Sequence, residues 1–353
     1  MNASSPRPSA SFLFSQFTTA ILPVVVSLSI TLLILLLVGA PPIPVFEHMW
    51  DGAFGDDLRR ADVLAAWVPM TLCAVGLLIT FTAGLWNIGV EGQIILGAIG
   101  ATWVVRTFPD LPAPLLLPLT LAGAAFSGAL WGLLAGVLKT YGNVHEIFGG
   151  MGLNFIAIGL TNYLIFGPWK QAGRATASGT EPYPLNAYLP TLEPLRLSPY
   201  ALAIALIALI LIYLSLRGTT WGLQLKAIGK NIRSAFLMGI PTHRHTLLAF
   251  LLAGTCAGLA GAVQTTVTYH RLIPAISSGY GYLAILVALL AGFRAIWVAP
   301  IAFFFAALSL GSRPLQMQLQ LDSSLGGVIQ GVLVLVVVMM QGLRRQPRQS
   351  VEQ

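Results

Sequence analysis

Apolar segments of membrane-spanning length recur along this chain from residue 19 to residue 343. Inside a bilayer every backbone N–H and C=O group needs a partner, so only helices and closed barrels can span it. A spanning barrel would show segments of about ten residues with alternating polarity, and the sequence contains none. Of the 353 residues 56% are hydrophobic and 9% charged, against roughly 25% charged residues in soluble domains. We therefore expect an all-α integral membrane protein, a polytopic bundle of about ten transmembrane helices.

The expected spans lie near 19–39, 63–83, 84–105, 114–138, 146–167, 198–216, 246–268, 280–292, 298–311 and 325–343. Several are shorter than the ~20 residues that a straight span needs. This favours broken or short helices that line a central path. The pair 280–292 and 298–311 is compatible with two short spans or with a re-entrant hairpin.

The domain organisation follows from these spans. Residues 19–343 are expected to form a single transmembrane domain, because only short polar connections separate the spans. Residues 1–18 are rich in Ser and Pro and are expected to form a flexible N-terminal tail, and residues 344–353 a basic C-terminal tail. The first apolar run is too long for a signal-peptide core, so we interpret it as a retained span.

The net charge of +7 is best explained by orientation in the membrane. With ten spans and the N-terminus inside, eleven of the 19 Lys and Arg residues fall on the inner side, as expected when cytoplasmic loops carry the excess of cations. The longest inner connection, 217–245, is densely cationic. We expect an inner-membrane, multi-pass protein with both termini in the cytoplasm, in contact with lipid and without a nucleic-acid partner.

A polar motif interrupts the third span. Residues 87–93 read Asn-Ile-Gly-Val-Glu-Gly-Gln and place a carboxylate, two amides and two glycines where lipid-facing sequence would be apolar. A charge near the bilayer interior costs at least ~2.5–3.5 kcal/mol, so it marks a functional position. Glycines allow the helix to break where the backbone is buried or lines a cavity. This motif is the strongest indication of a permeation path.

Five polar residues are candidates for that path. Glu91 has three interpretations: it supports opened backbone, contacts substrate, or relays protons. We favour the first, because buried carboxylates near broken helices usually serve the structure. The amides are expected either to bind hydroxyls of a substrate or to bridge helices; these residues are Asn87, Gln93, Asn154 and Gln264.

The 217–245 connection contains an amphipathic pattern. Its apolar positions and its cations each follow i, i+4, i+7 spacing, which predicts one short helix with two faces. Such a helix either lies on the anionic inner leaflet or docks on a cytoplasmic partner. The apolar positions are Ile228, Ile232 and Ala235, and the cations are Lys226, Lys230 and Arg233.

Signals for catalysis and for metal binding are missing from the sequence. No G-x-x-x-x-G-K-[ST] phosphate loop occurs, so this chain lacks that machinery for ATP hydrolysis. The five His and two Cys residues show no ligand spacing, and paired carboxylates or nucleophile–base pairs are not found. Cys73 and Cys256 are expected to be small buried side chains. We expect no catalytic residue, no metal and no bound cofactor.

Rows of glycine at four-residue spacing predict close helix contacts. They comprise Gly128, Gly132 and Gly136; Gly254 and Gly258; and Gly327 and Gly331. Packing within the chain is expected for most rows, and a dimer face for one. In the outer loop 168–197, three aromatic residues either anchor the interface or dock a partner: Trp169, Tyr183 and Tyr188.

Together these motifs resemble a known family, the permease subunits of bacterial ABC importers for nucleosides and simple sugars, which are branched-chain amino acid permease-like. Residues 87–93 resemble its N-I-G-V-E-G-Q signature without a mismatch, and this motif is specific to the nucleoside-type branch. Residues 226–240 resemble its cytoplasmic coupling segment, with fits at Gly229, Asn231, Ala235, Gly239 and Ile240.

A third motif of the same resemblance lies in 144–155. Val144-His145-Glu146 and the later Leu153-Asn154-Phe155 resemble V-N-E and L-N-Y, with His145 in place of asparagine. In the coupling segment, Ile232 replaces the usual proline. From the residues alone, Glu146 is expected in the first turn of a span, where a carboxylate favours the helix N-terminus.

The resemblance implies a ten-helix permease that moves nucleosides or related purine and pyrimidine compounds by alternating access. It implies a separate cytoplasmic ATPase that holds ATP and magnesium, a second homologous permease that is often distinct, and an extracytoplasmic substrate-binding lipoprotein. The alternatives are an ABC permease for ribose-like sugars or riboflavin, and a proton-coupled secondary transporter with Glu91 as the intramembrane carboxylate. A membrane enzyme is disfavoured.

Overall fold

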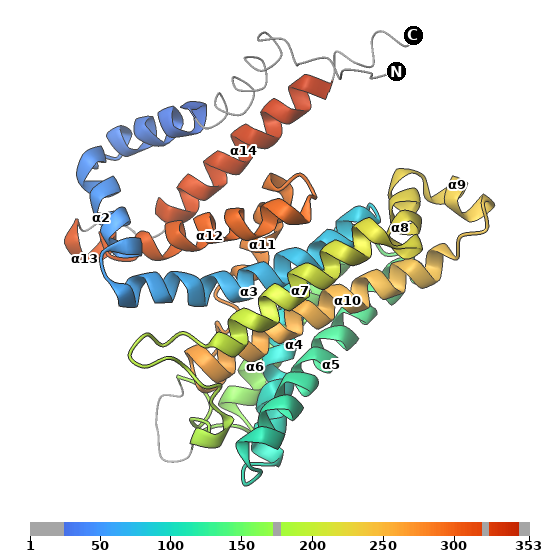
Figure 1. Ribbon diagram of the computed structural model, residues 1–353, viewed down its shortest axis with the longest axis horizontal. Coiled ribbons are helices and arrows are strands. Elements are labelled where there is room, and N and C mark those ends of the chain that lie inside the picture. Colours follow the sequence, from blue (N-terminus) through green and yellow to red (C-terminus); the bar gives the residue numbers. More distant parts are fainter. Residues whose placement is uncertain (1–24, 172–177, 320–324, 346–353) are drawn as a thin grey trace, which may run out of the picture. The chain divides into compact units, whose positions relative to one another are not determined.

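The computed structural model describes residues 25–171, 178–319 and 325–345, with side chains up to residue 339 in the last helix. The expected tail 1–18 and residues 346–353 of the expected basic tail lie outside the described residues. The described chain is helical and divides into two compact units. One comprises the N-terminal residues up to Gly55 together with Leu308 onward, and the other comprises Asp56–Ala307. Figure 1 labels the helices.

A helix is present at each of the ten expected spans, which confirms the polytopic helical class. Within the described residues, six helices are long and apolar enough to cross a membrane: Asp57–Thr82, Ala113–Thr140, Glu146–Phe166, Pro199–Gly218, Thr242–Thr268 and Ala295–Gln318. The pair Val25–Leu37 and α2 (Pro42–Phe54) is bent by 113°, as in a broken span or a re-entrant loop. The apolar helices α11 (Tyr280–Leu290) and α14 (Leu325–Arg345) and the helix α4 (Val90–Thr107) occupy the remaining expected positions.

The centre of the larger unit is built by α3 (Asp57–Thr82) and α4, with α5 (Ala113–Thr140) and α10 (Thr242–Val263) packed along them. The most apolar window of α3 is 89% buried. The most apolar window of α7 (Pro199–Gly218), in contrast, is only 22% buried. A helix that is apolar on all sides and exposed to this extent must face lipid, so α7 is peripheral and α3 central.

Glycine rows explain how α5 and α10 come so close. A Cβ atom on Gly128 would lie 2.4 Å from the carbonyl oxygen of Gly254, and one on Gly258 would lie 2.2 Å from the carbonyl oxygen of Ala124. These two expected rows therefore pack against each other within the chain, as backbones can approach where side chains are absent. Figure 1 shows the two helices side by side. Near Gly327 and Gly331 in α14, no atom of the described residues lies within 4 Å of such a Cβ.

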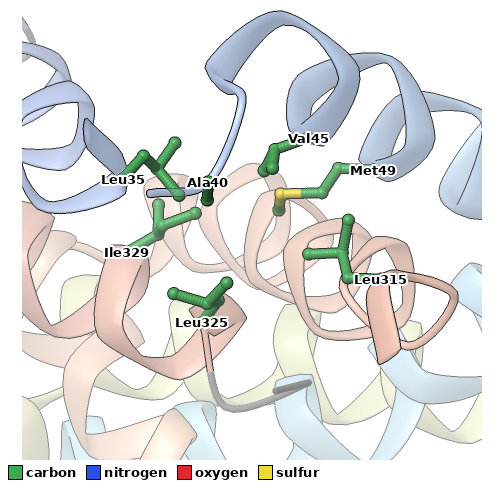
Figure 2. Close-up of a cluster of buried hydrophobic side chains, with 7 residues drawn as sticks. All are labelled: Leu35, Ala40, Val45, Met49, Leu315, Leu325 and Ile329. Atoms are coloured by element: carbon green, nitrogen blue, oxygen red, sulfur yellow. The ribbon is translucent and has the colours of Figure 1, made fainter. Parts of the chain in front are cut away.

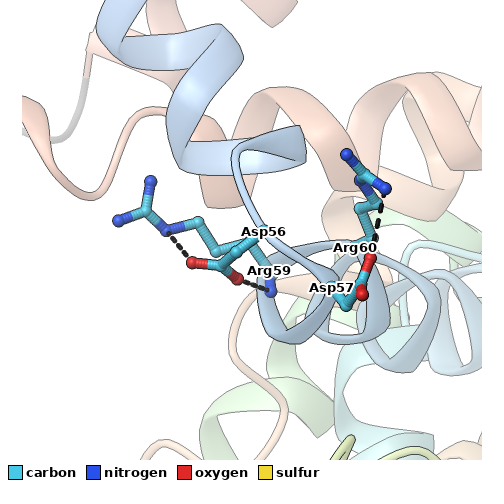
Figure 3. Close-up of polar contacts among 4 residues, drawn as sticks. All are labelled: Asp56, Asp57, Arg59 and Arg60. Atoms are coloured by element: carbon cyan, nitrogen blue, oxygen red, sulfur yellow. Dashed lines mark hydrogen bonds and ion pairs between the residues drawn. The ribbon is translucent and has the colours of Figure 1, made fainter.

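The start of α3 is set by acidic residues (Figure 3). Asp56 caps the helix: its Oδ1 accepts from the backbone N–H of Arg59 at 2.8 Å, and its Oδ2 lies 3.3 Å from Arg59 Nε. Asp57 pairs with Arg60 at 3.1 Å. Side-chain caps satisfy the free N–H groups of the first turn. Exposed ion pairs of this kind add little to stability, so the cap defines the helix start.

The smaller unit has its own apolar core (Figure 2). Leu35 and Ala40 from the N-terminal helix and its turn pack with Val45 and Met49 of α2. The C-terminal part adds Leu315 from α13 (Leu315–Gln318), together with Leu325 and Ile329 from α14. The sequence analysis placed no helix at α2, which is shorter and carries more polar side chains than a span.

Candidate translocation path and coupling segment

The turn between α3 and α4 carries the polar motif. At its start Gly84 adopts a positive φ of +73°. The N–H of Leu85 bonds to Thr80 O at 2.9 Å and that of Gly84 to Phe81 O at 3.0 Å. These paired bonds form a Schellman motif, which favours glycine at its left-handed position. Residues 84–89, expected within the third span, are therefore a turn, and α4 begins at Val90.

Glu91 lies at the N-termini of two helices. It belongs to the first turn of α4, and its side chain reaches the first turn of α11. Its Oε2 accepts from the backbone N–H of Gly281 at 2.9 Å, and its Oε1 accepts from Ser277 Oγ at 2.5 Å. The N-cap of α11, Gly279, offers no side chain for this purpose. A carboxylate satisfies these free N–H groups and matches the positive end of the helix dipole.

Asn87 and Gln93 satisfy each other. Asn87 Nδ2 donates to Gln93 Oε1 at 3.1 Å, and Gln93 Nε2 donates to Asn87 Oδ1 at 3.0 Å. Both side chains are buried. The reciprocal pair closes the turn onto the first turn of α4. Each amide uses one N–H and one oxygen lone pair in this pair, and burial shields the remaining ones from solvent in this conformation.

Asn154 ties α6 (Glu146–Phe166) to the same turn. Its Oδ1 accepts from the N–H of Gly92 at 2.8 Å, and its Nδ2 donates to the carbonyl of Ile88 at 3.0 Å. The glycines of the motif permit this approach. A Cβ on Gly92 would lie 2.9 Å from Asn154 Oδ1, and a Cβ on Gly150 would lie 2.6 Å from the backbone nitrogen of Gly89.

Gln264 lies further along, in a π-helical segment, η2 (Gln264–Thr268), that continues α10. Its Nε2 donates to Ile276 O at 3.3 Å and to Ser278 Oγ at 3.4 Å, and its Oε1 accepts from Thr268 Oγ1 at 3.1 Å. Gln264 thus holds the 276–278 loop whose Ser277 bonds to Glu91. Single π-turns inside α-helices often occur at functional positions.

All five expected path residues are therefore buried and hydrogen-bonded within the chain. Four of them meet at the N-terminus of α4, and Gln264 joins through the serine loop. The sequence analysis missed Ser277; the small and polar run Ser-Ser-Gly-Tyr-Gly at 277–281, just before an apolar span, was the available signal. It also missed Trp131, whose buried Nε1 has no partner among the described residues.

The described residues of the 168–197 loop, which is expected on the outer side, cover the far ends of these helices. Tyr183 OH lies 2.6 Å from Thr102 Oγ1 of α4, and the Tyr183 N–H donates to His270 O at 2.8 Å. Tyr188 stacks on the His270 ring at 3.8 Å, and Arg106 lies over the Trp169 ring. Burial lowers the pKa of His270. All three aromatics of this loop contact the rest of the chain.

The opposite end of the bundle, which is expected to face the cytoplasm, agrees with the sequence predictions in part. Glu146 is the first residue of α6, as expected, and its carboxylate lies 2.5 Å from Lys139 Nζ. The prediction of a single amphipathic helix in 217–245 is wrong. Two helices occur, α8 (Thr220–Lys230) and α9 (Ile232–Leu237), because Asn231 is extended and caps α9 through a 2.9 Å bond from the Ser234 N–H.

The break separates the expected apolar face. Ile228 and Ala235 are buried within the unit, whereas Ile232 is 53% exposed. The exposed apolar residues instead gather on and after α9, with Phe236, Leu237 and Met238 at 64%, 78% and 80% exposure. We call Ile232, Phe236, Leu237 and Met238 the α9 surface. The cations Lys230 and Arg233 are exposed beside it, whereas Lys226 Nζ turns back to Leu216 O at 2.7 Å.

The structure explains why two positions of the coupling motif are occupied by glycine. Gly239 has a φ of +82°, and the bonds Gly239 N to Phe236 O and Ile240 N to Ala235 O end α9 with a second Schellman motif. Gly229 packs on the end of α3: a Cβ there would lie 2.2 Å from Thr82 O, and one on Gly84 would lie 3.2 Å from the Gly229 backbone. Helix α8 thus directly contacts the turn that leads into Asn87.

With this arrangement established, comparison with known proteins identifies the family. Residues 60–338 match the family described as branched-chain amino acid transport system / permease component. The chain belongs to this family. It is therefore a multi-pass membrane permease of an ABC importer, a transport subunit rather than an enzyme. A secondary transporter driven by Glu91 is thereby set aside.

Three relatives of this permease are similar over most of their length. The guanosine ABC transporter permease protein NupP of Bacillus subtilis is 29% identical over 336 residues, covering 94% of this chain and 95% of NupP. The glucose ABC transporter permease protein TsgB13 of Haloferax volcanii is 30% identical, covering 93% and 89%. The nucleoside ABC transporter permease protein NupB of Lactococcus lactis subsp. cremoris is 28% identical, covering 79% of each chain.

Proposed function

We propose that this permease carries nucleosides or related purine and pyrimidine compounds into the cell, driven by ATP hydrolysis on a separate subunit. The observation that carries the proposal is the segment 87–93, which resembles the signature of the nucleoside-type branch at every position. Two of the three relatives above are named for guanosine or nucleosides. Nucleosides offer several hydroxyls and base edges, which suit a path built from amides, serines and a carboxylate.

The partners follow from the type of transporter. A cytoplasmic ATPase holds ATP and magnesium, and this chain binds no cofactor of its own. A second, homologous permease completes the path, and an extracytoplasmic binding lipoprotein delivers substrate. The α9 surface is the proposed ATPase contact, because an apolar cluster flanked by Lys230 and Arg233 suits a groove with an acidic rim. Three other residues of the coupling motif do not face the ATPase in this proposal; they fix α8 and α9 to the rest of the permease. These are Ile228, Gly229 and Ala235.

The contact of Gly229 with Thr82 and Gly84 suggests how a movement would travel. Displacement of α8 by the ATPase would press on the end of α3 and on the turn that carries Asn87. Opening of the path then requires the reciprocal amide pair and the Asn154 bonds to rearrange. Coupling of this kind needs an element with two discrete arrangements, and the α3–α4 turn is the proposed one. Trp131 Nε1 lies 2.9 Å from a Cβ built on Gly92 and offers a free donor to a substrate there.

The orientation belongs to the same proposal: the 217–245 segment and both termini face the cytoplasm. A cysteine at the exposed Ser234 tests this, because the only native cysteines, Cys73 and Cys256, are buried. A membrane-impermeant thiol reagent should label Ser234→Cys in inside-out vesicles and leave intact cells unlabelled. Labelling in intact cells would contradict the orientation.

The transport function itself is tested by uptake. Cells lacking their own nucleoside uptake, and expressing this permease with its neighbouring ATPase, second permease and lipoprotein, should accumulate labelled guanosine or uridine. Uptake should persist when a protonophore collapses the proton gradient while ATP is maintained, and it should stop when the ATPase is inactivated. Excess unlabelled nucleoside should compete, and glucose should not.

Glucose is the second candidate substrate, favoured by the similarity to TsgB13. Accumulation of labelled glucose without accumulation of nucleosides, under the same conditions, would replace the nucleoside proposal with this one. The ATPase dependence and the role of the α9 surface would stand in either case.

A further inference from the structure

A basic cavity lies beside the coupling segment, outside the polar network. Its volume is about 360 Å³. Its walls come from the end of α3, the end of α7, α8, and the corner between α11 and α12 (Ala295–Gly311). This is the end of the bundle that carries the 217–245 segment, so the orientation proposed above puts the cavity at the inner leaflet.

Three cations from three different elements line this cavity, and none of its lining residues in the described part of the chain is a carboxylate. They are Arg217 at the end of α7, Lys226 on α8 and Arg294 at the α11–α12 corner. Among the described residues none of the three forms an ion pair. Arg217 lies over the Tyr213 ring and donates to its hydroxyl, which fixes the guanidinium in place. A concave site with three positive groups and no internal counter-ion favours an anionic ligand.

The rest of the lining is apolar. Leu216, Phe293 and Ile296 contribute to the walls, and Ile296 is 63% exposed. Nearby Trp86 and Trp297 are also exposed, at 41% and 52%. Exposed tryptophans with neighbouring cations are typical of the level where headgroups meet acyl chains. The ligand therefore needs a charged group and a hydrocarbon tail.

We propose that this cavity binds the phosphate group of an anionic phospholipid, with the acyl chains lying along Phe293 and Ile296. Basic pockets between helices at the cytoplasmic side of a membrane are suited to such headgroups. An inorganic phosphate ion shares the anionic chemistry and lacks the tail, so the apolar wall argues for the lipid.

The position of the site gives it a consequence for transport. Phe293 packs edge-on against Phe81 at 5.5 Å, and Phe81 packs against Trp86 at 5.3 Å. Trp86 directly precedes Asn87, and Lys226 belongs to α8. A bound lipid would therefore touch the proposed coupling helix at Lys226 and the end of α3 at Thr82, and it would reach the turn only through Phe293 and Phe81. Occupancy should support coupling of ATP hydrolysis to uptake.

The test is lipid binding to the purified full-length chain in detergent, measured by native mass spectrometry. Phosphatidylglycerol is compared with phosphatidylcholine of the same acyl chains, and inorganic phosphate is added as a competitor. Each cation near a charged lipid contributes on the order of fivefold in affinity. Arg217→Gln/Arg294→Gln should therefore weaken phosphatidylglycerol binding on the order of 25-fold and leave phosphatidylcholine binding unchanged.

The matched control is Lys230→Gln/Arg233→Gln, which removes two exposed cations from the same inner segment but outside the cavity. It should retain phosphatidylglycerol binding. The charge-conserving Arg217→Lys/Arg294→Lys should also retain most of it, which separates lost charge from misfolding. Lys226→Gln is an independent third variant. It removes one cation, so its loss of phosphatidylglycerol affinity should be on the order of fivefold.

Three results would overturn the proposal. Equal losses in the cavity and control variants would indicate only general surface electrostatics. Equal affinity for phosphatidylcholine would indicate an apolar annular contact. Displacement of the lipid by inorganic phosphate would indicate a free-anion site. Each of these is independent of the transported substrate, so failure here and failure of the nucleoside proposal are distinguishable.

Discussion

The sequence predicts a functional role for both the motif at 87–93 and the segment at 220–240, yet the two regions differ in which kind of side chain they bury and which kind they expose. The first buries polar side chains and pairs every one of them inside the bundle. The second exposes apolar side chains on and directly after the short helix α9. Buried polar groups without partners are costly, whereas a large exposed apolar cluster marks a contact surface. We propose that the first region stabilises the permease and that the second binds its ATPase.

The largest effect on stability is expected at Asn154. Asn154→Leu removes an acceptor from the N–H of Gly92 and a donor from the carbonyl of Ile88, both buried. Two unsatisfied backbone groups should lower the free energy of unfolding by about 3 kcal/mol. Denaturant unfolding of the purified permease measures this. Tyr163→Leu, at a position 67% exposed on the same helix, is the control and should change little.

Glu91→Gln should come next. The amide keeps one acceptor for Ser277 or Gly281 but turns an NH₂ group toward the other donor. A charge-assisted bond is replaced, so a loss of about 2 kcal/mol is expected, with residual uptake still dependent on ATP. Asp57→Asn at the exposed ion pair of Figure 3 should cost under ~0.5 kcal/mol. A stable Glu91→Gln protein without uptake would assign the carboxylate to substrate contact.

The amide pair should show a smaller, coupled effect. Asn87→Ala and Gln93→Ala each leave one buried amide unpaired and should each cost about 1 kcal/mol. The double variant should cost less than the sum, because the two residues satisfy each other. A double-mutant cycle on unfolding measures the coupling. Additive costs, with uptake lost in each single variant, would favour separate contacts with substrate.

The predictions above depend on hydrogen-bond partners that could not be identified from the sequence. Apolar length is a local property, so a helix could be placed at each of the ten expected spans. Glycine spacing correctly predicted close packing on one face of α5 and of α10, but it did not predict that these two helices pack against each other. The partner of Glu91 lies 190 residues away at Gly281, and nothing local selects it. The break at Asn231 was also hidden, because i, i+4, i+7 spacing is the same whether a helix continues or stops at a cap.

The smallest effect on stability is expected at the α9 surface, together with the largest effect on assembly. Phe236→Ala/Met238→Ala trims side chains that are 64% and 80% exposed, so the free energy of unfolding should change by under ~0.5 kcal/mol. Ile207→Ala/Ile210→Ala, at positions 56% and 54% exposed on α7, is the matched control for lost apolar surface.

The central claim is that the α9 surface binds the ATPase, whereas the 87–93 motif stabilises the permease. Co-purification of the ATPase with these two variants tests this claim most directly. We expect the α9 variant to insert and fold normally while retaining little ATPase and showing no ATP-driven uptake, and the α7 control to retain both. An α9 variant that binds the ATPase as the unaltered permease does, and still couples its hydrolysis to uptake, would contradict the assignment of this surface.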